Sequence, residues 1–136
     1  MIQGVGIDII HNNQIKKSIK KYGERYLDKV FTRGEQEYCN SRPDPVPHFA
    51  ARFAAKEACI KACGARLTRS GQIMRNMEVV LDERGCPSFQ LHGETAERIP
   101  EKNFRIHLSL THDKMVASAV AVLESVLSHP GPEHGQ

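Results

Sequence analysis

The sequence contains no tryptophan, and aromatic residues make up only 6% of it. Its core must therefore be filled largely by aliphatic side chains and alanine. Paired cysteine motifs of the zinc-binding kind are also missing, although four cysteines are present. We expect these four to be buried free thiols, since cysteine is among the residues most often buried. They are Cys39, Cys59, Cys63 and Cys86.

Long hydrophobic runs are absent as well. No apolar stretch approaches the roughly 20 residues that a membrane-spanning helix needs, and no secretory signal opens the chain. We therefore expect a cytoplasmic protein with reduced thiols and no membrane partner. The formal net charge of +3, from 19 basic and 16 acidic side chains, is too small to indicate a nucleic-acid partner. A chain of 136 residues with 26% charged residues is typical of one globular domain.

The hydrophobic patterns predict hairpins and helices in one chain, which indicates the α+β class. We expect a single domain over residues 1–124, followed by a tail over residues 125–136 that is rich in Pro, Gly and His and is predicted to be disordered. Strands are predicted at Met1–Ile10, Glu78–Asp82, Cys86–Leu91, Arg105–Leu110 and Met115–Leu123. Helices are predicted at Asn12–Leu27 with a break at Gly23, from Thr32 to Tyr38, at His48–Cys63 and at Glu94–Ile99, with loops at Ser41–Pro47 and Ala65–Asn76.

Two acidic residues stand in places where chemistry could occur. Asp8 lies near the end of a strand whose glycines leave little bulk on one face, so that another group could approach the backbone. Glu57 precedes Lys61 by one helical turn in the alanine-rich helix. The ordinary alternatives are that Asp8 forms a turn and that Glu57 and Lys61 form a surface ion pair.

Three basic or titratable residues complete the candidate constellations. Arg52 and Lys56 lie on the same predicted helix as Glu57, and both could equally be solvated surface residues. His112 ends the S-x-T-H sequence at the end of a predicted strand, where an ordinary turn residue is the alternative. None of these signals is specific by itself.

Together, however, these segments resemble the holo-acyl-carrier-protein synthase family of phosphopantetheinyl transferases. The resemblance covers residues 1–124 and rests on G-V-G-I-D-I-I, on F-A-A-R-F-A-A-K-E-A-C-I-K-A-C-G and on I-H-L-S-L-T-H. The R-F-A-A-K-E-A sequence at Arg52–Ala58 is the most specific part, and T-R-G-E at Thr32–Glu35 is similar to the family's T-x-x-E. The resemblance implies an antiparallel sheet packed against a long central helix. It also implies transfer of 4′-phosphopantetheine from coenzyme A to a serine of apo acyl carrier protein, in support of fatty acid biosynthesis.

The resemblance implies roles for particular residues. Asp8 and Glu57 match the family's magnesium ligands, and Lys61 matches a lysine that contacts coenzyme A near its phosphates. These three are the implied catalytic residues. The proton of the attacking serine would pass either to a water on the magnesium or to Glu57, and the sequence leaves both open. Residues implied to bind coenzyme A are Arg52, Lys61, Gly64, Arg66 and His112.

Two segments depart from the family pattern. The family carries E-x-x-R-I after the first strand, where this chain has His11-Asn12-Asn13-Gln14-Ile15. The family follows the central helix with G-T-G, where this chain has Gly64-Ala65-Arg66. We expect the loop Ala65–Gly71 to reach the nucleotide end of coenzyme A through Arg66 or Arg69.

The resemblance also implies a homotrimer with active sites between subunits. A basic helix face is the predicted docking surface for the acyl carrier protein, with a solvated face as the alternative. Two other functions stay open: a non-catalytic basic module that binds an acidic protein or nucleic acid, and a related transferase that serves a polyketide carrier domain. The basic face comprises Lys16, Lys17, Lys20, Lys21 and Arg25.

Overall fold

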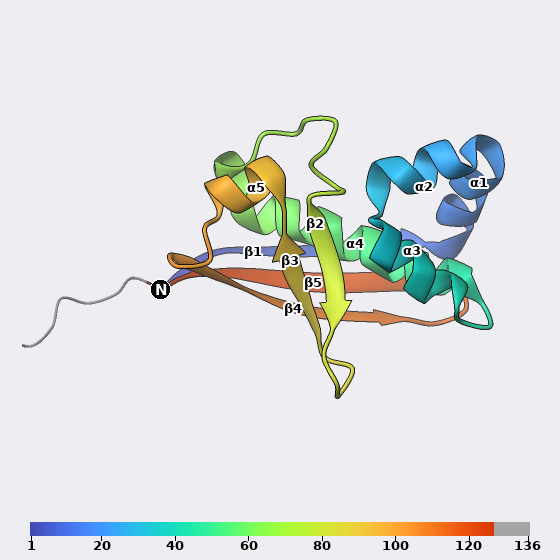
Figure 1. Cartoon of the computed structure of the whole chain (residues 1–136). Coiled ribbons are helices and arrows are strands. Elements are labelled where there is room, and N and C mark those ends of the chain that lie inside the picture. Colours follow the sequence, from blue (N-terminus) through green and yellow to red (C-terminus); the bar gives the residue numbers. More distant parts are fainter. Residues whose placement is uncertain (127–136) are drawn as a thin grey trace, which may run out of the picture.

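The computed structural model describes residues 1–126, and its framework is a three-stranded antiparallel sheet (Figure 1). The strand order is β1-β5-β4, so that the first and last strands of the chain pair along their length. A separate hairpin, β2-β3, crosses on the same side as the helices. The bounds are β1 (Ile2–His11), β2 (Met77–Leu81), β3 (Pro87–Leu91), β4 (Phe104–His112) and β5 (Val116–Ser125).

Five α-helices and one short 3₁₀ helix are described, and the longest, α4, runs over the sheet (Figure 1). The α+β class and the long central helix are thereby confirmed. Within residues 1–126, none of the helices is both long and apolar enough to cross a membrane. The bounds are α1 (Asn12–Tyr22), α2 (Glu24–Val30), α3 (Arg33–Asn40), α4 (Pro45–Cys63), η1 (Gly64–Arg66) and α5 (Gly93–Arg98).

Most predicted element boundaries agree with the structure. Gly23 separates α1 from α2 with a φ of 58°, and Gly64 ends α4 with a φ of 56°, a region that favours glycine. The prediction of a loop over Ser41–Pro47 is partly wrong, because α4 begins at Pro45. Proline is tolerated in a first helical turn, where its missing N–H would have no partner. Strand β5 extends to Ser125, and residues 127–136 of the predicted tail lie outside the described residues.

The contact between β1 and α4 is made by backbone atoms. A Cβ atom added to Gly4 would stand 1.9 Å from the carbonyl oxygen of Ala62, and one added to Gly6 would stand 1.9 Å from that of Ala58. Only glycine fits at such a distance. The strand therefore lies directly against the helix, and Asp8, two residues further along the same face, is brought beside it.

A buried ion pair joins α4 to the elements around it. The ammonium group of Lys56 lies 2.6 Å from the carboxylate of Glu35, and both side chains are fully buried. The same nitrogen donates hydrogen bonds to the carbonyl oxygens of Val30 and Met74. The second oxygen of Glu35 accepts from the backbone N–H of Val79 at 2.7 Å. One ion pair thus holds the end of α2, helix α3, the loop before β2 and β2 itself onto α4.

Glu35 of the T-x-x-E sequence pairs with Lys56 and also caps helix α3 together with Thr32. The Thr32 side chain accepts a hydrogen bond from the backbone of Glu35, and the Glu35 side chain accepts one from the backbone of Thr32, so that the two residues form a capping box at the start of α3. Burial lowers the pKa of Lys56, while the charge of Glu35 acts in the opposite direction. With three acceptors around its three protons, the ammonium form of Lys56 is fully hydrogen-bonded.

Replacing Lys56 should destabilise the fold far more than replacing a surface lysine. Lys56→Met leaves the Glu35 carboxylate buried without a counter-charge, which typically costs about 3–5 kcal/mol. Chemical denaturation would measure the loss, with Lys102→Met at an exposed lysine as the matched control. Adding Glu35→Gln to Lys56→Met should recover part of the stability. Equal stability of Lys56→Met and Lys102→Met would contradict the assigned role of the ion pair.

Candidate active site

The first cluster of predicted site residues lies where β1 meets α4. The Lys61 ammonium group lies 3.1 Å from the carboxylate of Asp8 and donates a second hydrogen bond to the carbonyl oxygen of Ile7 at 2.8 Å. The Asp8 side chain is 19% exposed and that of Lys61 is 54% exposed. The structure therefore brings these two predicted residues together at the surface, although they are far apart in the sequence.

Glu57 lies on the same side of α4 but has a different partner from the one expected. Both its oxygens accept hydrogen bonds from the guanidinium group of Arg69, at 3.3 and 3.2 Å. The alternative of an ion pair between Glu57 and Lys61 is wrong, since each of them pairs elsewhere. The pKa of Tyr26 is raised by burial and further by the charge of Glu57, so that α2 also borders this cluster.

A second cluster, made of aromatic and basic side chains, lies around Arg52. The Arg52 side chain is only 3% exposed, so the alternative of a solvated arginine is wrong. Its guanidinium carbon stands 4.4 Å from the centre of the Tyr38 ring, and one of its terminal nitrogens donates to the carbonyl oxygen of His48. Its Nε has no hydrogen-bond partner in the structure. The ring of His48 packs edge-to-face with that of His112 at 4.7 Å.

The second cluster concentrates positive charge. The guanidinium carbon of Arg42 also lies over the Tyr38 ring, 5.8 Å from its centre. Burial lowers the pKa of His48, and the neighbouring His112, Arg52 and Arg42 lower it further. His48 is thereby biased toward its neutral form, and the fixed positive charges of Arg52 and Arg42 favour an anion as ligand.

Helical geometry separates the two clusters. Arg52 and Lys61 are nine residues apart on α4, which places them about 180° apart around the helix axis and roughly 13 Å along it. Asp8 belongs to β1 and His112 to β4, the two edge strands of the sheet. The residues of the matched segments therefore gather on opposite sides of α4 within one chain.

The remaining predicted coenzyme A contacts lie at the far end of α4. Gly64 ends the helix, and Arg66 donates to the side chain of Gln3 at 3.0 Å and lies over the ring of Phe104. Gln3 precedes Asp8 by five residues on β1, a separation of roughly 17 Å. Arg66 and Arg69, predicted as equivalent contacts, thus have different surroundings.

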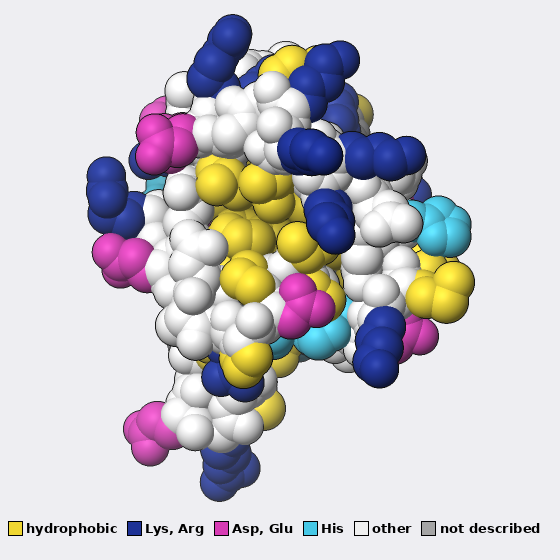
Figure 2. Space-filling view, turned by 90° about the vertical axis from the view of Figure 1, so that its right-hand side faces the viewer, with side chains coloured by type: hydrophobic (Ala, Val, Ile, Leu, Met, Phe, Trp, Pro, Cys, Tyr) yellow, Lys and Arg dark blue, Asp and Glu magenta, His cyan; other side chains and the backbone are white. Residues whose placement is uncertain are grey.

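The predicted docking face is fully exposed. Lys and Arg side chains gather along the upper part of the end of the molecule that carries α1, α2 and α3, above an apolar hollow (Figure 2). Ile15, on the opposite side of α1, is buried. The exposed basic residues of this face are Lys16, Lys17, Lys20, Lys21 and Arg25.

Among residues 1–126, no three His, Cys, Asp or Glu side chains are grouped so that they could hold a metal ion. Magnesium does not require such a set, because it is commonly bound by one or two carboxylates together with substrate phosphates and waters. Asp8 and Glu57 fit this pattern: each is partly exposed, and each carboxylate already attracts a cationic side chain.

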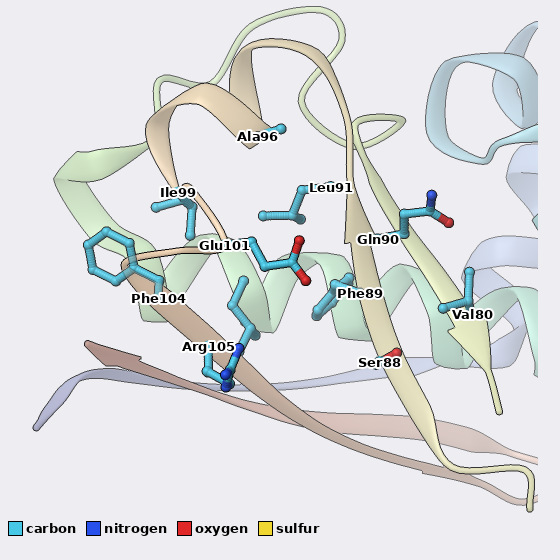
Figure 3. A pocket seen from close by; sticks show the side chains of 11 residues that line it. Val80, Ser88, Phe89, Gln90, Leu91, Ala96, Ile99, Glu101, Phe104 and Arg105 are labelled. Carbon is cyan, nitrogen blue, oxygen red and sulfur yellow. The ribbon is translucent and has the colours of Figure 1, made fainter. Parts of the chain in front are cut away.

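A groove of about 630 Å³ lies away from both clusters. Side chains of β3 and of the segment from α5 to β4, including Phe89, Leu91, Ile99 and Phe104, surround it (Figure 3). None of the predicted site residues lines it. We assign the site from the charged groups of the two clusters and not from this groove.

Several contacts of the two clusters, and the buried ion pair of α4, were not predicted. Lys56 and Glu35 were seen in the sequence but not as a buried pair, because nothing in either local pattern indicates contact across 21 positions. His48 stands one helical turn before Arg52, a spacing that could have joined it to the second cluster. Arg69 as the partner of Glu57 had no signal, since the loop between them is irregular.

Comparisons with known proteins identify the family of the chain. The family model described as "4'-phosphopantetheinyl transferase superfamily" matches residues 4–113. The holo-[acyl-carrier-protein] synthase of Methylobacterium sp. (strain 4-46) is 40% identical over 93% of this chain and 96% of that protein. That of Nocardia farcinica is 43% identical over 90% of this chain and 88% of that protein.

Solved structures give the same picture. The acyl carrier protein synthase of Mycobacterium tuberculosis is 38% identical, with a TM-score of 0.73 over 93% of this chain and all of that one. A structure described as "Chronobacterium ammoniagenes ACPS-CoA complex" is 28% identical, with a TM-score of 0.79 over 91% of this chain and 98% of that one.

Proposed function

Since the chain belongs to the 4′-phosphopantetheinyl transferase superfamily, and within it to the holo-[acyl-carrier-protein] synthases, we propose that it modifies an acyl carrier protein in support of fatty acid biosynthesis in the cytoplasm. The enzyme transfers the 4′-phosphopantetheine group from coenzyme A to a serine of the apo carrier. This excludes the alternative of a non-catalytic basic module. The site is supported by the contact between Asp8 and Lys61, which belong to two different segments of the family resemblance. The Lys61 ammonium group lies 3.1 Å from the Asp8 carboxylate.

The reaction joins the carrier serine oxygen to the phosphorus that bears pantetheine and breaks the bond from that phosphorus to 3′,5′-ADP. Asp8 and Glu57 would hold a magnesium ion against the pyrophosphate, with a carboxylate from a strand and one from a helix. When bound, this ion offsets the charge that develops on the leaving phosphate. Lys61 stands one turn beyond Glu57 on α4 and contacts the same phosphates.

The second cluster suits the nucleotide end of coenzyme A. Arg52 and His112 were assigned to this ligand by family resemblance, and the unpartnered Nε of buried Arg52 supports an anion there. Arg42 adds a second positive charge that would receive the phosphate on the ribose, and His48 lies beside this surface. Gly64 and Arg66 keep their assignment to coenzyme A from family resemblance.

Two features of the chain support a homotrimer with shared sites. The two clusters lie on opposite sides of α4, so that one coenzyme A molecule could contact both only if each came from a different copy. The outer face of the sheet carries Val5, Ile7 and Ile9, each between 61% and 67% exposed. No described element covers this face in residues 1–126 (Figure 1). Packing of sheets against one another would bury these side chains.

A charge on this face should break the assembly. We expect wild-type protein to scatter light as a trimer at micromolar concentration and Ile7→Glu to scatter as a smaller species. Transfer should fall in the same variant, because each site would lose one of its two halves. Circular dichroism would check that the fold survives, and Gln90→Glu, at an exposed position of β3, is the control. A monomeric and active wild-type enzyme would rule the shared site out.

The exposed basic face of α1 and α2 is the proposed docking surface for the carrier. Reversing charge with Lys17→Glu and Lys20→Glu should raise the KM for the carrier about tenfold at low salt, because complementary charge accelerates association. The KM for coenzyme A should not change. Steady-state kinetics at several salt concentrations would measure this, with Arg98→Glu and Lys102→Glu as the control for net charge. A carrier KM that is insensitive to both reversal and salt would favour a merely solvated face.

The carboxylate pair gives the direct test of the proposed chemistry. Asp8→Asn and Glu57→Gln keep size and hydrogen bonding but each removes one ligand charge, so that kcat/KM should fall about 100-fold or more. Added magnesium should restore part of the rate of Asp8→Asn, since weak metal binding is the expected defect. Mass spectrometry of the carrier would follow transfer, and Asp28→Asn at an exposed site is the control. Near-wild-type transfer by both variants without added metal would mean that no two-carboxylate site exists.

A further inference from the structure

Each carboxylate of the proposed metal pair already holds a cationic side chain. Asp8 is paired with Lys61 and Glu57 with Arg69, and these are different contacts on the same side of α4. Lys61 was assigned to the coenzyme A phosphates from family resemblance. The resemblance implies no role for Arg69 beside the metal, because Arg69 belongs to the loop where this chain departs from the family pattern.

The contact between Arg69 and Glu57 is bidentate. Two guanidinium nitrogens donate to the two carboxylate oxygens, at 3.3 and 3.2 Å, so that both oxygens are occupied. This geometry adds strength and direction to an ion pair. A divalent cation that binds Glu57 must therefore displace the guanidinium group from at least one oxygen.

The surroundings allow Arg69 to move away. Its side chain is 59% exposed, whereas that of Glu57 is 21% exposed. A hollow of about 330 Å³ lies beside it, lined also by Lys29, Ser70 and Gly71. The loop behind this hollow is held to the core at Met74, whose carbonyl oxygen accepts from buried Lys56. The arginine can leave Glu57 while the base of its loop stays in place.

We propose that Arg69 is an exchangeable counter-ion of the active site, which neutralises Glu57 in the free enzyme and passes to the pyrophosphate of coenzyme A when a divalent cation takes its place. This inference rests on the proposed assignment of Asp8 and Glu57 to the metal. Binding of the cation and of coenzyme A then support each other. The cation displaces Arg69 from Glu57, which leaves Arg69 free to bind the phosphates. The phosphates in turn bind Arg69, which leaves Glu57 free to bind the cation.

The test is the affinity of the protein for Mn²⁺, measured from the electron paramagnetic resonance signal of the free ion in the absence of coenzyme A. Arg69→Gln removes the competing charge and should bind Mn²⁺ roughly two- to fivefold more tightly, the range expected for loss of one exposed ion pair. Arg75→Gln is the matched control, because it removes the same charge from the same loop but contacts only the carbonyl oxygen of Asp28. It should leave the Mn²⁺ affinity within error of wild type.

A second measurement separates exchange from simple competition. With Mn²⁺ present at saturation, calorimetry should show that Arg69→Gln binds coenzyme A several-fold more weakly than wild type and Arg75→Gln. Equal Mn²⁺ affinities of the two variants, or unchanged coenzyme A affinity in Arg69→Gln, would overturn the proposal. Asp8→Asn identifies the cause of a failure. If that variant binds Mn²⁺ as tightly as wild type, the metal assignment itself is wrong; if it binds weakly, only the role of Arg69 is wrong.

Discussion

The buried ion pair between Lys56 and Glu35 is the constraint on which the rest of the structure depends. Two charges inside a protein are tolerated only when their hydrogen-bonding capacity is used up, and here the hydrogen-bond partners come from different elements. The elements cannot shift independently, because each movement would leave a buried charge with a missing partner. Glu57, the neighbour of Lys56 in the sequence, is held at the surface by this arrangement. The proposed metal ligand Glu57 is thus positioned by the buried contacts of its neighbour Lys56.

Helix α4 divides the functional groups between its two sides. The carboxylates and Lys61 face the region of β1 and α2, whereas Arg52 lies with His48 and His112 on the other side. The first group suits a cation with phosphates, and the second suits an anion alone. The proposed division of one coenzyme A molecule between the two clusters would require copies of the chain to assemble, and the uncovered apolar face of the sheet offers a surface for doing so.

The sequence predicted local structure well and contacts between distant segments poorly. The helix break at Gly23 and the helix start at Thr32 depend on neighbours in the chain, so that both were recognised correctly. The burial of Arg52 depends on Tyr38 and on the surrounding helices, and no local pattern indicates it. Asp8 was singled out by the glycines of its strand, and its role as a magnesium ligand was implied by family resemblance. Arg69 shows the limit most clearly, since its partner is determined by the path of an irregular loop.

The contact of Gly4 and Gly6 with the carbonyl oxygens of α4 has a consequence for how such a site can change over time. Where side chains separate two elements, a larger or smaller residue alters the spacing between them. Here the spacing between β1 and α4 is set by backbone peptide groups, which are the same whatever the side chain. Mutations elsewhere in the core can accumulate without altering the distance from β1 to α4, whereas the two glycine positions admit almost no variation. The position of Asp8 beside α4 is therefore insulated from drift in the apolar residues around it, whereas the outer face of the same strand would be constrained by the proposed packing between copies.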